Sequence, residues 1–268
     1  MNIIKRHRYL ISRRVVQIGL LILFAGSNYA GWNIFKGNYS SGVILDTIPL
    51  SDPYAVLQIL FSGFLAGSDL LLGALIVLVI YGLLFGRIFC SWICPLNIVS
   101  DTALNISNRL KADARFKVST KTRYGVLVLG LILSSILGIS AFEIVSPVSI
   151  LHRGLIFGIG AGWAVIAAIF LFDIAVLKNG WCGHLCPLGA FYSLIGRYAL
   201  LKVKHNSDNC TNCNRCFAVC HEPQVLDIIG KQNGVIKSGE CTNCARCIEV
   251  CDDDALGFSI SNNFIRSS

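Results

Sequence analysis

The sequence predicts an all-α membrane domain over residues 1–198, followed by a small α+β domain over residues 199–268. Charged residues make up only 14% of the 268 residues and hydrophobic residues 54%, with a mean hydropathy of +0.64. Soluble domains contain about 25% charged residues, so a soluble fold of this composition would lack polar surface. All twelve cysteines lie after position 89, as two pairs followed by two quartets. These cysteines indicate metal or redox chemistry.

The net charge of +8 is divided unevenly along the chain. Residues 1–198 hold 16 Lys/Arg against 7 Asp/Glu, a balance of +9, and residues 199–268 hold 7 against 8, a balance of −1. The positive charges of the first part flank apolar stretches instead of forming one basic surface. We therefore expect no nucleic-acid partner and attribute the excess to membrane orientation.

Four apolar stretches approach the length of about 20 residues that a membrane-spanning helix needs. They cover residues 15–35, 70–89, 124–142 and 155–177. A fifth stretch, residues 54–65, is too short to span and is interpreted as an interfacial or re-entrant helix that begins at Pro53. The twin arginines Arg13 and Arg14 could also belong to an export signal, but the apolar run is longer than a signal-peptide core and three more spans follow it.

Lysine and arginine counts predict the orientation of these spans, because cationic loops stay in the cytoplasm. The predicted outer loops carry one cation each, Lys36 and Arg153. The amino-terminal segment carries five cations and the loop between the second and third spans carries six: Lys5, Arg6, Arg8, Arg13 and Arg14, then Arg109, Lys111, Arg115, Lys117, Lys121 and Arg123. Both termini are therefore predicted to be cytoplasmic.

An internal repeat divides the membrane domain into two similar two-helix units. The segment "FCSWICPLN" (89–97) aligns with "WCGHLCPLG" (181–189) at an offset of 92 residues, and Pro53 and Leu57 align with Pro147 and Leu151 at an offset of 94. Each unit ends in C-x-x-x-C-P, which supplies Cys90 and Cys94 or Cys182 and Cys186. Parallel repeats commonly surround a shared site.

The chemistry of the C-x-x-x-C-P pairs stays open at this point. Cysteines at i and i+4 lie on one helical face, and the following proline ends or kinks the helix. Four thiolates would suit zinc or an iron–sulfur centre, and a redox dithiol is another option. Buried thiols that only pack helix ends are the structural alternative. The pairs are therefore a candidate for a further metal centre.

The two quartets, "CTNCNRCFAVC" (210–220) and "CTNCARCIEVC" (241–251), share the spacing C-x-x-C-x-x-C-x-x-x-C. This spacing is typical of bacterial ferredoxins with two 4Fe–4S clusters, in which the fourth cysteine of each run serves the other cluster. The similarity implies two ligand sets: Cys210, Cys213, Cys216 and Cys251 for cluster one, and Cys241, Cys244, Cys247 and Cys220 for cluster two. His221 and Asp252 stand where those ferredoxins have proline. Zinc knuckles use fewer ligands per run, and disulfides do not suit a reducing cytoplasm.

Spans, C-x-x-x-C-P pairs and a ferredoxin tail together resemble the NapH-type membrane ferredoxins, the quinol dehydrogenase membrane components of periplasmic nitrate reductase systems. The resemblance covers nearly the whole chain. It implies a bacterial inner-membrane electron-transfer subunit that oxidises quinol from the quinone pool. It also implies a periplasmic iron–sulfur or multihaem protein as electron acceptor.

Quinol oxidation releases two protons and two electrons, so proton acceptors must lie near the quinol. Ionisable residues at membrane depth are rare because burying them in the bilayer is energetically unfavourable. Asp173 and His184 are therefore the candidate acceptors. Asp173 could instead cap a helix or pair with Lys178. Asp52, Glu143 and His152 lie at the opposite edge of the predicted membrane domain.

Two other function classes compete with quinol oxidation. A metal-reducing or assembly factor would use the C-x-x-x-C-P thiols to bind an ion, although the chain contains one methionine and no His-rich tract. A redox-sensing membrane scaffold would use the ferredoxin domain to dock a partner. Metal content per chain and cluster reduction by quinol separate these hypotheses.

Overall fold

The computed structural model describes residues 7–29, 31–32, 35–110, 118–157, 160 and 162–260. The chain divides into two compact units. The first contains Met1–Val16, Val79–Ile93 and Tyr192–Ser268, and the second contains Gln17–Leu78 and Cys94–Phe191. This division differs from the boundary at residue 198 that the sequence predicts, because residues 79–93 pack with the carboxy-terminal residues. Of the predicted cytoplasmic cations, Lys5, Arg6, Lys111, Arg115 and Lys117 lie outside the described residues.

Two of the described helices are long and apolar enough to cross a membrane, over residues 8–27 and 68–85. The first belongs to helix α2 (Arg8–Tyr29). It begins earlier than residue 15 and ends before Phe35, which lies in a strand, so both predicted ends were wrong. The second consists of α4 (Ser68–Val79) and the π-helical segment η1 (Ile80–Phe85). Gly86 ends it at a φ of +66°, a backbone conformation that glycine adopts without steric cost.

A small sheet follows the first helix and corrects the prediction of an all-α membrane half. Its strands form an antiparallel meander in the order β1 (Phe35–Gly37), β2 (Ser41–Ile44) and β3 (Ile48–Ser51). The Asn38 side chain accepts hydrogen bonds from the N–H groups of Ser40 and Ser41, at 2.9 and 2.8 Å, which stabilises the turn between the first two strands.

The short apolar stretch after this sheet is a helix that begins at Pro53, as the sequence predicts. Helix α3 (Pro53–Phe61) has Asp52 as its N-cap, and the Asp52 carboxylate accepts the Tyr54 N–H at 3.3 Å. The buried Tyr54 hydroxyl donates to the Leu127 carbonyl of α6 at 3.3 Å. Helix α3 is therefore fixed to the helix of the third predicted span.

The third and fourth predicted spans are shorter than expected. Helix α6 (Thr122–Leu137) ends at Gly138, which has a φ of +66°, so residues 139–142 do not continue it. Residues 155–157 end helix α8 instead of beginning the fourth span, which is represented by α9 (Gly162–Ala175). The remaining elements of this region are α5 (Leu96–Arg109), α7 (Ala141–Val145), α8 (Pro147–Phe157), α10 (Pro187–Gly196), and the π-helical turns η2 (Phe89–Ile93) and η3 (Trp181–Leu185).

The order of elements around the two cysteine pairs is the same, apart from the additional segment η1 in the first copy. A helix that begins with proline (α3 or α8) precedes an apolar helix (α4 or α9), then a π-helical turn with the first cysteine, and then a helix at the proline after the second cysteine. The i, i+4 spacing lies in π-helical turns and not in the α-helix that we expected. Cys186 N–H bonds the Trp181 carbonyl five residues earlier, at 2.9 Å. Such turns are frequent at functional sites.

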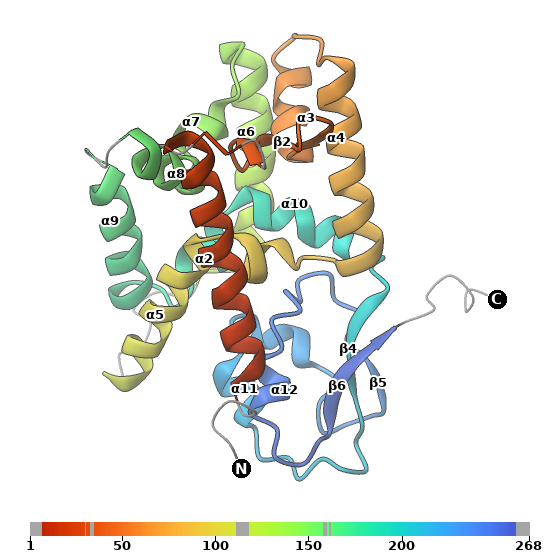
Figure 1. Ribbon diagram of the computed structural model, residues 1–268. Coiled ribbons are helices and arrows are strands. Elements are labelled where there is room, and N and C mark those ends of the chain that lie inside the picture. The colour runs from red at the N-terminus through yellow and green to blue at the C-terminus, as the bar shows by residue number, and fades with distance from the viewer. Residues whose placement is uncertain are drawn as a thin grey trace, which may run out of the picture. The chain divides into compact units, whose positions relative to one another are not determined.

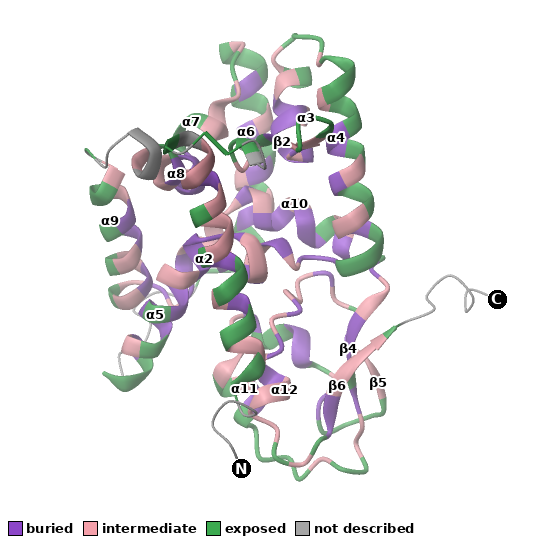
Figure 2. Ribbon diagram, in the orientation of Figure 1, coloured by how far each residue is buried: buried purple, intermediate pink, exposed green. Residues whose placement is uncertain are grey.

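Figure 2 shows exposed residues along α4 and α6, and many of these residues are apolar. Helix α4 buries only Gly73, Ala74 and Val77. Soluble monomers rarely expose large contiguous apolar surfaces. The exposed residues include Leu71, Leu72 and Leu75 of α4, and Val128, Leu129, Ile132 and Ile136 of α6.

The carboxy-terminal region has the α+β composition that the sequence predicts (Figure 1). Strand β4 (Leu201–His205) lies between β5 (Gly234–Val235) and β6 (Leu256–Ile260), antiparallel to both. Short helices α11 (Arg215–Val219) and α12 (Arg246–Glu249) and the 3-10 turn η4 (Pro223–Leu226) complete it. Val203, Leu226 and Ile236 form the core together with cysteine side chains.

Helix α2 begins against this region. The Glu249 carboxylate accepts the N–H groups of Tyr9 and Leu10, at 2.7 and 2.9 Å, and the Tyr9 ring packs edge-on against Phe258. A carboxylate at a helix N-terminus satisfies free N–H groups and complements the helix dipole. The carboxy-terminal region therefore fixes the start of the first apolar helix.

Candidate metal centres

The two quartet loops share one backbone conformation. Asn212 and Asn214 in the first loop have φ angles of 55° and 58°, and Asn243 and Ala245 in the second have 50° and 61°. Left-handed residues at every second position curve a loop so that successive N–H groups face its concave side, which suits an anionic centre. Ala245 tolerates this conformation at a cost of about 1–2 kcal/mol, as strained residues at functional sites do.

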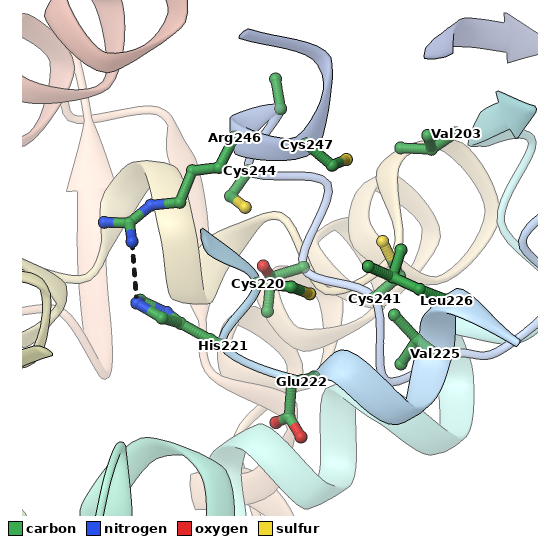
Figure 3. Close-up of a pocket in the computed structure, with 12 residues that line it drawn as sticks. Val203, Cys220, His221, Glu222, Val225, Leu226, Cys241, Cys244, Arg246 and Cys247 are labelled. Carbon is green, nitrogen blue, oxygen red and sulfur yellow. Dashed lines mark hydrogen bonds between the residues drawn. The ribbon is translucent and has the colours of Figure 1, made fainter. Parts of the chain in front are cut away.

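Each loop curves around a cavity that the last cysteine of the other run completes. Cavity one is lined by Cys210, Cys213, Cys216 and Cys251, and cavity two by Cys241, Cys244, Cys247 and Cys220. Figure 3 shows the four sulfur atoms of cavity two around a common space. The fold thus brings together the same two sets of four that the ferredoxin pattern implies as ligands.

The thiols surround a space instead of meeting at a point. Within the described residues, no three Cys, His, Asp or Glu side chains converge closely enough to hold a single metal ion. Zinc ligands meet at one ion at about 2.0–2.3 Å, whereas cluster ligands bind separate iron atoms at the corners of a larger body. The arrangement therefore fits a multi-iron cluster better than zinc.

Burial raises the pKa of the Cys241 thiol to about 12, and it raises the pKa values of Cys216, Cys220 and Cys247 as well. A buried thiol with a raised pKa becomes a thiolate when a metal replaces its proton. Metal binding at these cavities therefore releases protons, and acid favours metal loss.

The two positions that depart from the ferredoxin pattern make equivalent contacts. His221 Nε2 lies 3.0 Å from the Arg246 guanidinium (Figure 3), and the Asp252 carboxylate accepts a hydrogen bond from Arg215. Arg246 lies in the loop of cavity two, and His221 follows Cys220, which completes that cavity. In the same way, Arg215 lies in the loop of cavity one, and Asp252 follows Cys251, which completes cavity one. Polar pairing replaces proline at both positions.

The first C-x-x-x-C turn contacts the loop of cavity two. Ser91 Oγ donates to the Thr242 carbonyl at 2.7 Å, and Trp92 Nε1 donates to the Asn243 carbonyl at 3.1 Å. The Asn243 amide donates in return to the Phe85 carbonyl at 3.0 Å. The contacts of Ser91 and Trp92 could not be read from the sequence, because the partners lie 151 residues apart.

Arg87 is the other residue that sequence reasoning missed. Its buried guanidinium donates to the Glu222 carboxylate at 2.9 Å and to the Glu240 carbonyl at 3.2 Å. Glu222 follows Cys220 by two residues, and Glu240 precedes Cys241. The sequence feature that could have indicated Arg87 is its position as a lone cation at the end of an apolar stretch, where a charged side chain is energetically costly.

The other cysteines of the C-x-x-x-C-P pairs belong to the second unit, whereas Cys90 belongs to the first. In the second unit Ser100 Oγ lies 3.4 Å from Cys182 Sγ, and the buried Arg123 guanidinium donates to the Gly183 carbonyl at 3.2 Å. The turn that carries Cys182 is therefore held from two sides. Coordination of a metal by Cys90, Cys94, Cys182 and Cys186 stays a prediction.

Asp173 is fully buried and holds that same turn. Its carboxylate accepts the Trp181 N–H at 3.0 Å and the Ser100 hydroxyl at 2.8 Å. Lys178 donates to Asn108 at 3.4 Å. Asp173 therefore caps the first residue of the η3 turn, which is the helix-capping role that the sequence suggested for it. His184, the second candidate proton acceptor, contacts the Asn179 carbonyl at 3.4 Å through Nδ1.

At the opposite edge, His152 is buried among aromatic rings. It lies edge-on to Phe24 and Tyr39, with centroids 5.1 and 5.6 Å away. Burial and the adjacent Arg153 charge lower the His152 pKa. Nearby in the chain, Glu143 accepts hydrogen bonds from Ser40 and Ser149.

Two family models match the chain. One described as "4Fe-4S binding domain" matches residues 69–112 and 159–206, which include both C-x-x-x-C-P motifs, and one described as "4Fe-4S dicluster domain" matches residues 202–252. No solved structure matches the chain.

Curated relatives match most of the chain. The "Methylamine utilization ferredoxin-type protein MauN" of Methylorubrum extorquens is 44% identical over 242 residues, which cover 89% of this chain and 84% of the relative. The "Ferredoxin-type protein NapH" of Haemophilus influenzae is 44% identical over 222 residues, which cover 82% and 77%. NapH of Escherichia coli is 41% identical over 223 residues, which cover 83% and 78%.

The expected resemblance to NapH is confirmed, and MauN proteins are as similar to the chain as NapH proteins are. Identity therefore does not separate the two groups. With 4Fe–4S domain matches at both cysteine quartets and relatives along most of its length, this chain belongs to the family of ferredoxin-type proteins that includes NapH and MauN.

Proposed function

We propose that this protein is a membrane-bound electron carrier that oxidises quinol and passes the electrons toward a periplasmic reductase system such as nitrate reductase. The observation that carries the proposal is that an apolar helix and a turn beside cavity two follow each other closely along the chain. The apolar helix over residues 68–85 is followed at once by the turn that hydrogen-bonds the loop of cavity two. An electron source in the bilayer and a cysteine-lined cavity would then lie at the two ends of one segment.

Two 4Fe–4S clusters would occupy the cavities, cluster one on Cys210, Cys213, Cys216 and Cys251, and cluster two on Cys241, Cys244, Cys247 and Cys220. Each cluster accepts one electron, so two clusters match the two electrons of one quinol. The residues around the cavities fit this role because they provide four thiols for each cavity and concave loops.

In this proposal the protein lies in the bacterial inner membrane with four spans and both termini in the cytoplasm. The exposed apolar residues of α6 and α9 support lipid contact for the two shorter helices. At 1.5 Å per residue these helices cover roughly 24 and 21 Å, so flanking residues or local thinning must complete each crossing. The repeated order of elements and the family model that matches twice support a duplicated two-helix unit.

Asp173 and His184 are proposed as acceptors of the quinol protons. Asp173 is buried on the apolar helix α9, and its contacts with Ser100 and Trp181 fix its orientation. The partner of the protein would be a periplasmic iron–sulfur or multihaem protein. Both the nitrate system suggested by NapH and the methylamine system named for MauN are compatible with the chain.

A second candidate function involves the C-x-x-x-C-P thiols. The family model for 4Fe–4S binding that matches both motifs favours a further metal centre there. Replacing Cys90, Cys94, Cys182 and Cys186 by serine and measuring iron and labile sulfide tests it. Two cubane clusters account for about eight iron atoms per chain, so an unchanged content of eight would rule out a further iron–sulfur centre.

Quinol oxidation is tested on purified protein in detergent. Addition of a short-chain benzoquinol or naphthoquinol should bleach the visible absorbance of the oxidised clusters and produce the EPR signal of the reduced state. Clusters that stay oxidised with both quinols, while dithionite reduces them, would refute the proposal.

A further inference from the structure

A buried ion pair beside cavity two bears on redox chemistry. Arg87 and Glu222 form this pair, which has almost no solvent access, with side-chain exposures of 2% and 5%. The ion pair at cavity one, Arg215 with Asp252, is about half exposed on both sides. Exposed pairs are screened by water, whereas buried charges act strongly on their surroundings.

Both charges of the buried pair are tied to cysteine-bearing segments of cavity two. The Arg87 guanidinium reaches the carbonyl of Glu240, next to Cys241, and Glu222 itself lines the cavity two residues after Cys220. The buried guanidinium of Arg87 thus lies beside the segment that carries Cys241, where a positive charge stabilises negative charge on the Cys241 sulfur. A charge that stabilises a thiolate also stabilises additional negative charge on a cluster bound to that thiolate.

We infer that the Arg87–Glu222 pair sets the reduction potential of the cluster held by Cys220, Cys241, Cys244 and Cys247. The inference rests on the proposed cluster ligands but not on quinol as the electron donor. Reduction adds one electron, and hence one negative charge, to the cluster. Arg87 favours that reduced state and Glu222 opposes it, so the balance of the pair adjusts the potential.

The positively charged member of this ion pair, Arg87, belongs to the membrane-associated part of the chain. Arg87 lies two residues after the apolar helix over residues 68–85, and Gly86 provides the turn between them. The potential of one cluster is thus governed by a residue outside the cysteine-rich sequence. Among the residues that the structure describes, the ion pair beside cavity one is the half-exposed Arg215 with Asp252.

The test compares Arg87→Gln with Glu222→Gln, because both variants break the same ion pair but remove opposite charges. Redox titration followed by EPR should show one midpoint potential moved down in Arg87→Gln and the same midpoint moved up in Glu222→Gln. We expect at least a tenfold change in the reduced-to-oxidised ratio at fixed potential, which is 59 mV for a one-electron couple. Arg215→Gln, at the exposed pair, is the control and should leave that midpoint in place.

The outcomes are separable. Shifts of the same sign in both variants, shifts of both midpoints together, or no shift would overturn the inference, since a purely structural role has no reason to reverse sign with the charge removed. If Arg87→Gln loses iron, two other variants still test the inference. Glu222→Gln should raise the midpoint potential, and Arg87→Lys, which keeps the positive charge, should leave it near the wild-type value. Wild-type protein without two EPR-active clusters would instead refute the cluster assignment.

Discussion

Asn243 provides the sharpest test of how the loop of cavity two is held, because the chain contains a matched control. Asn243 and Asn212 occupy equivalent positions, and their φ angles of 50° and 55° place both in the left-handed region. The buried Asn243 amide donates to the carbonyls of Phe85 and Leu201, at 3.0 and 2.9 Å, whereas Asn212 is exposed. Alanine at either position incurs the same backbone cost.

Asn243→Ala additionally removes two part-buried hydrogen bonds, each of which contributes about 1 kcal/mol. The sum, about 2 kcal/mol, corresponds to a roughly 30-fold larger opening equilibrium of the loop. Asn212→Ala lacks this contribution. The difference between the two variants therefore isolates the two hydrogen bonds from the effect of backbone conformation.

Iron loss to an excess of chelator measures this opening, because capture tracks the open population when closing is fast. Purified protein in detergent should lose iron about 30-fold faster in Asn243→Ala than in Asn212→Ala, and in the former about half of the iron should leave in the fast phase. Equal rates in the two variants would refute the reasoning that these two hydrogen bonds close the loop.

Three further predictions concern other contacts. Glu249→Ala should speed hydrogen exchange at the Tyr9 amide several-fold, since a carboxylate at a helix N-terminus contributes up to about 1 kcal/mol, and unchanged exchange would contradict the contact. Asp173→Asn should retain iron, because the amide oxygen can still accept the Trp181 N–H, but should slow cluster reduction by quinol; an unchanged rate would remove Asp173 from the proton path. The lowered His152 pKa means that the unfolded chain binds the proton more tightly, so thermal stability should fall as pH drops below about 6.5, and His152→Gln should flatten this dependence.

Local spacing explains which parts of the site could be predicted. Three cysteines of each quartet lie within seven residues, and the fourth follows from the two-cluster pattern, so the grouping of thiols was readable from the chain alone. The contacts of Arg87 and Trp92 were not readable, because their partners lie 135 and 151 residues away. The sheet over residues 35–51 was missed because its strands have only three or four residues, too few for a clear alternating pattern.

The two copies of the C-x-x-x-C turn have diverged where their surroundings differ. The offset of 92 residues pairs Ser91 with Gly183 and Trp92 with His184. In the first copy both side chains donate to the loop of cavity two, while in the second Gly183 contributes only its carbonyl, which accepts from Arg123. The backbone turn and the cysteines are thus common to both copies, and the two residues after Cys90 adapt the first copy to the ferredoxin loop. Any role that the two copies share must therefore depend on the cysteines and the proline, which both copies retain. The side chains that contact the ferredoxin loop, Ser91 and Trp92, explain a role of the first copy alone.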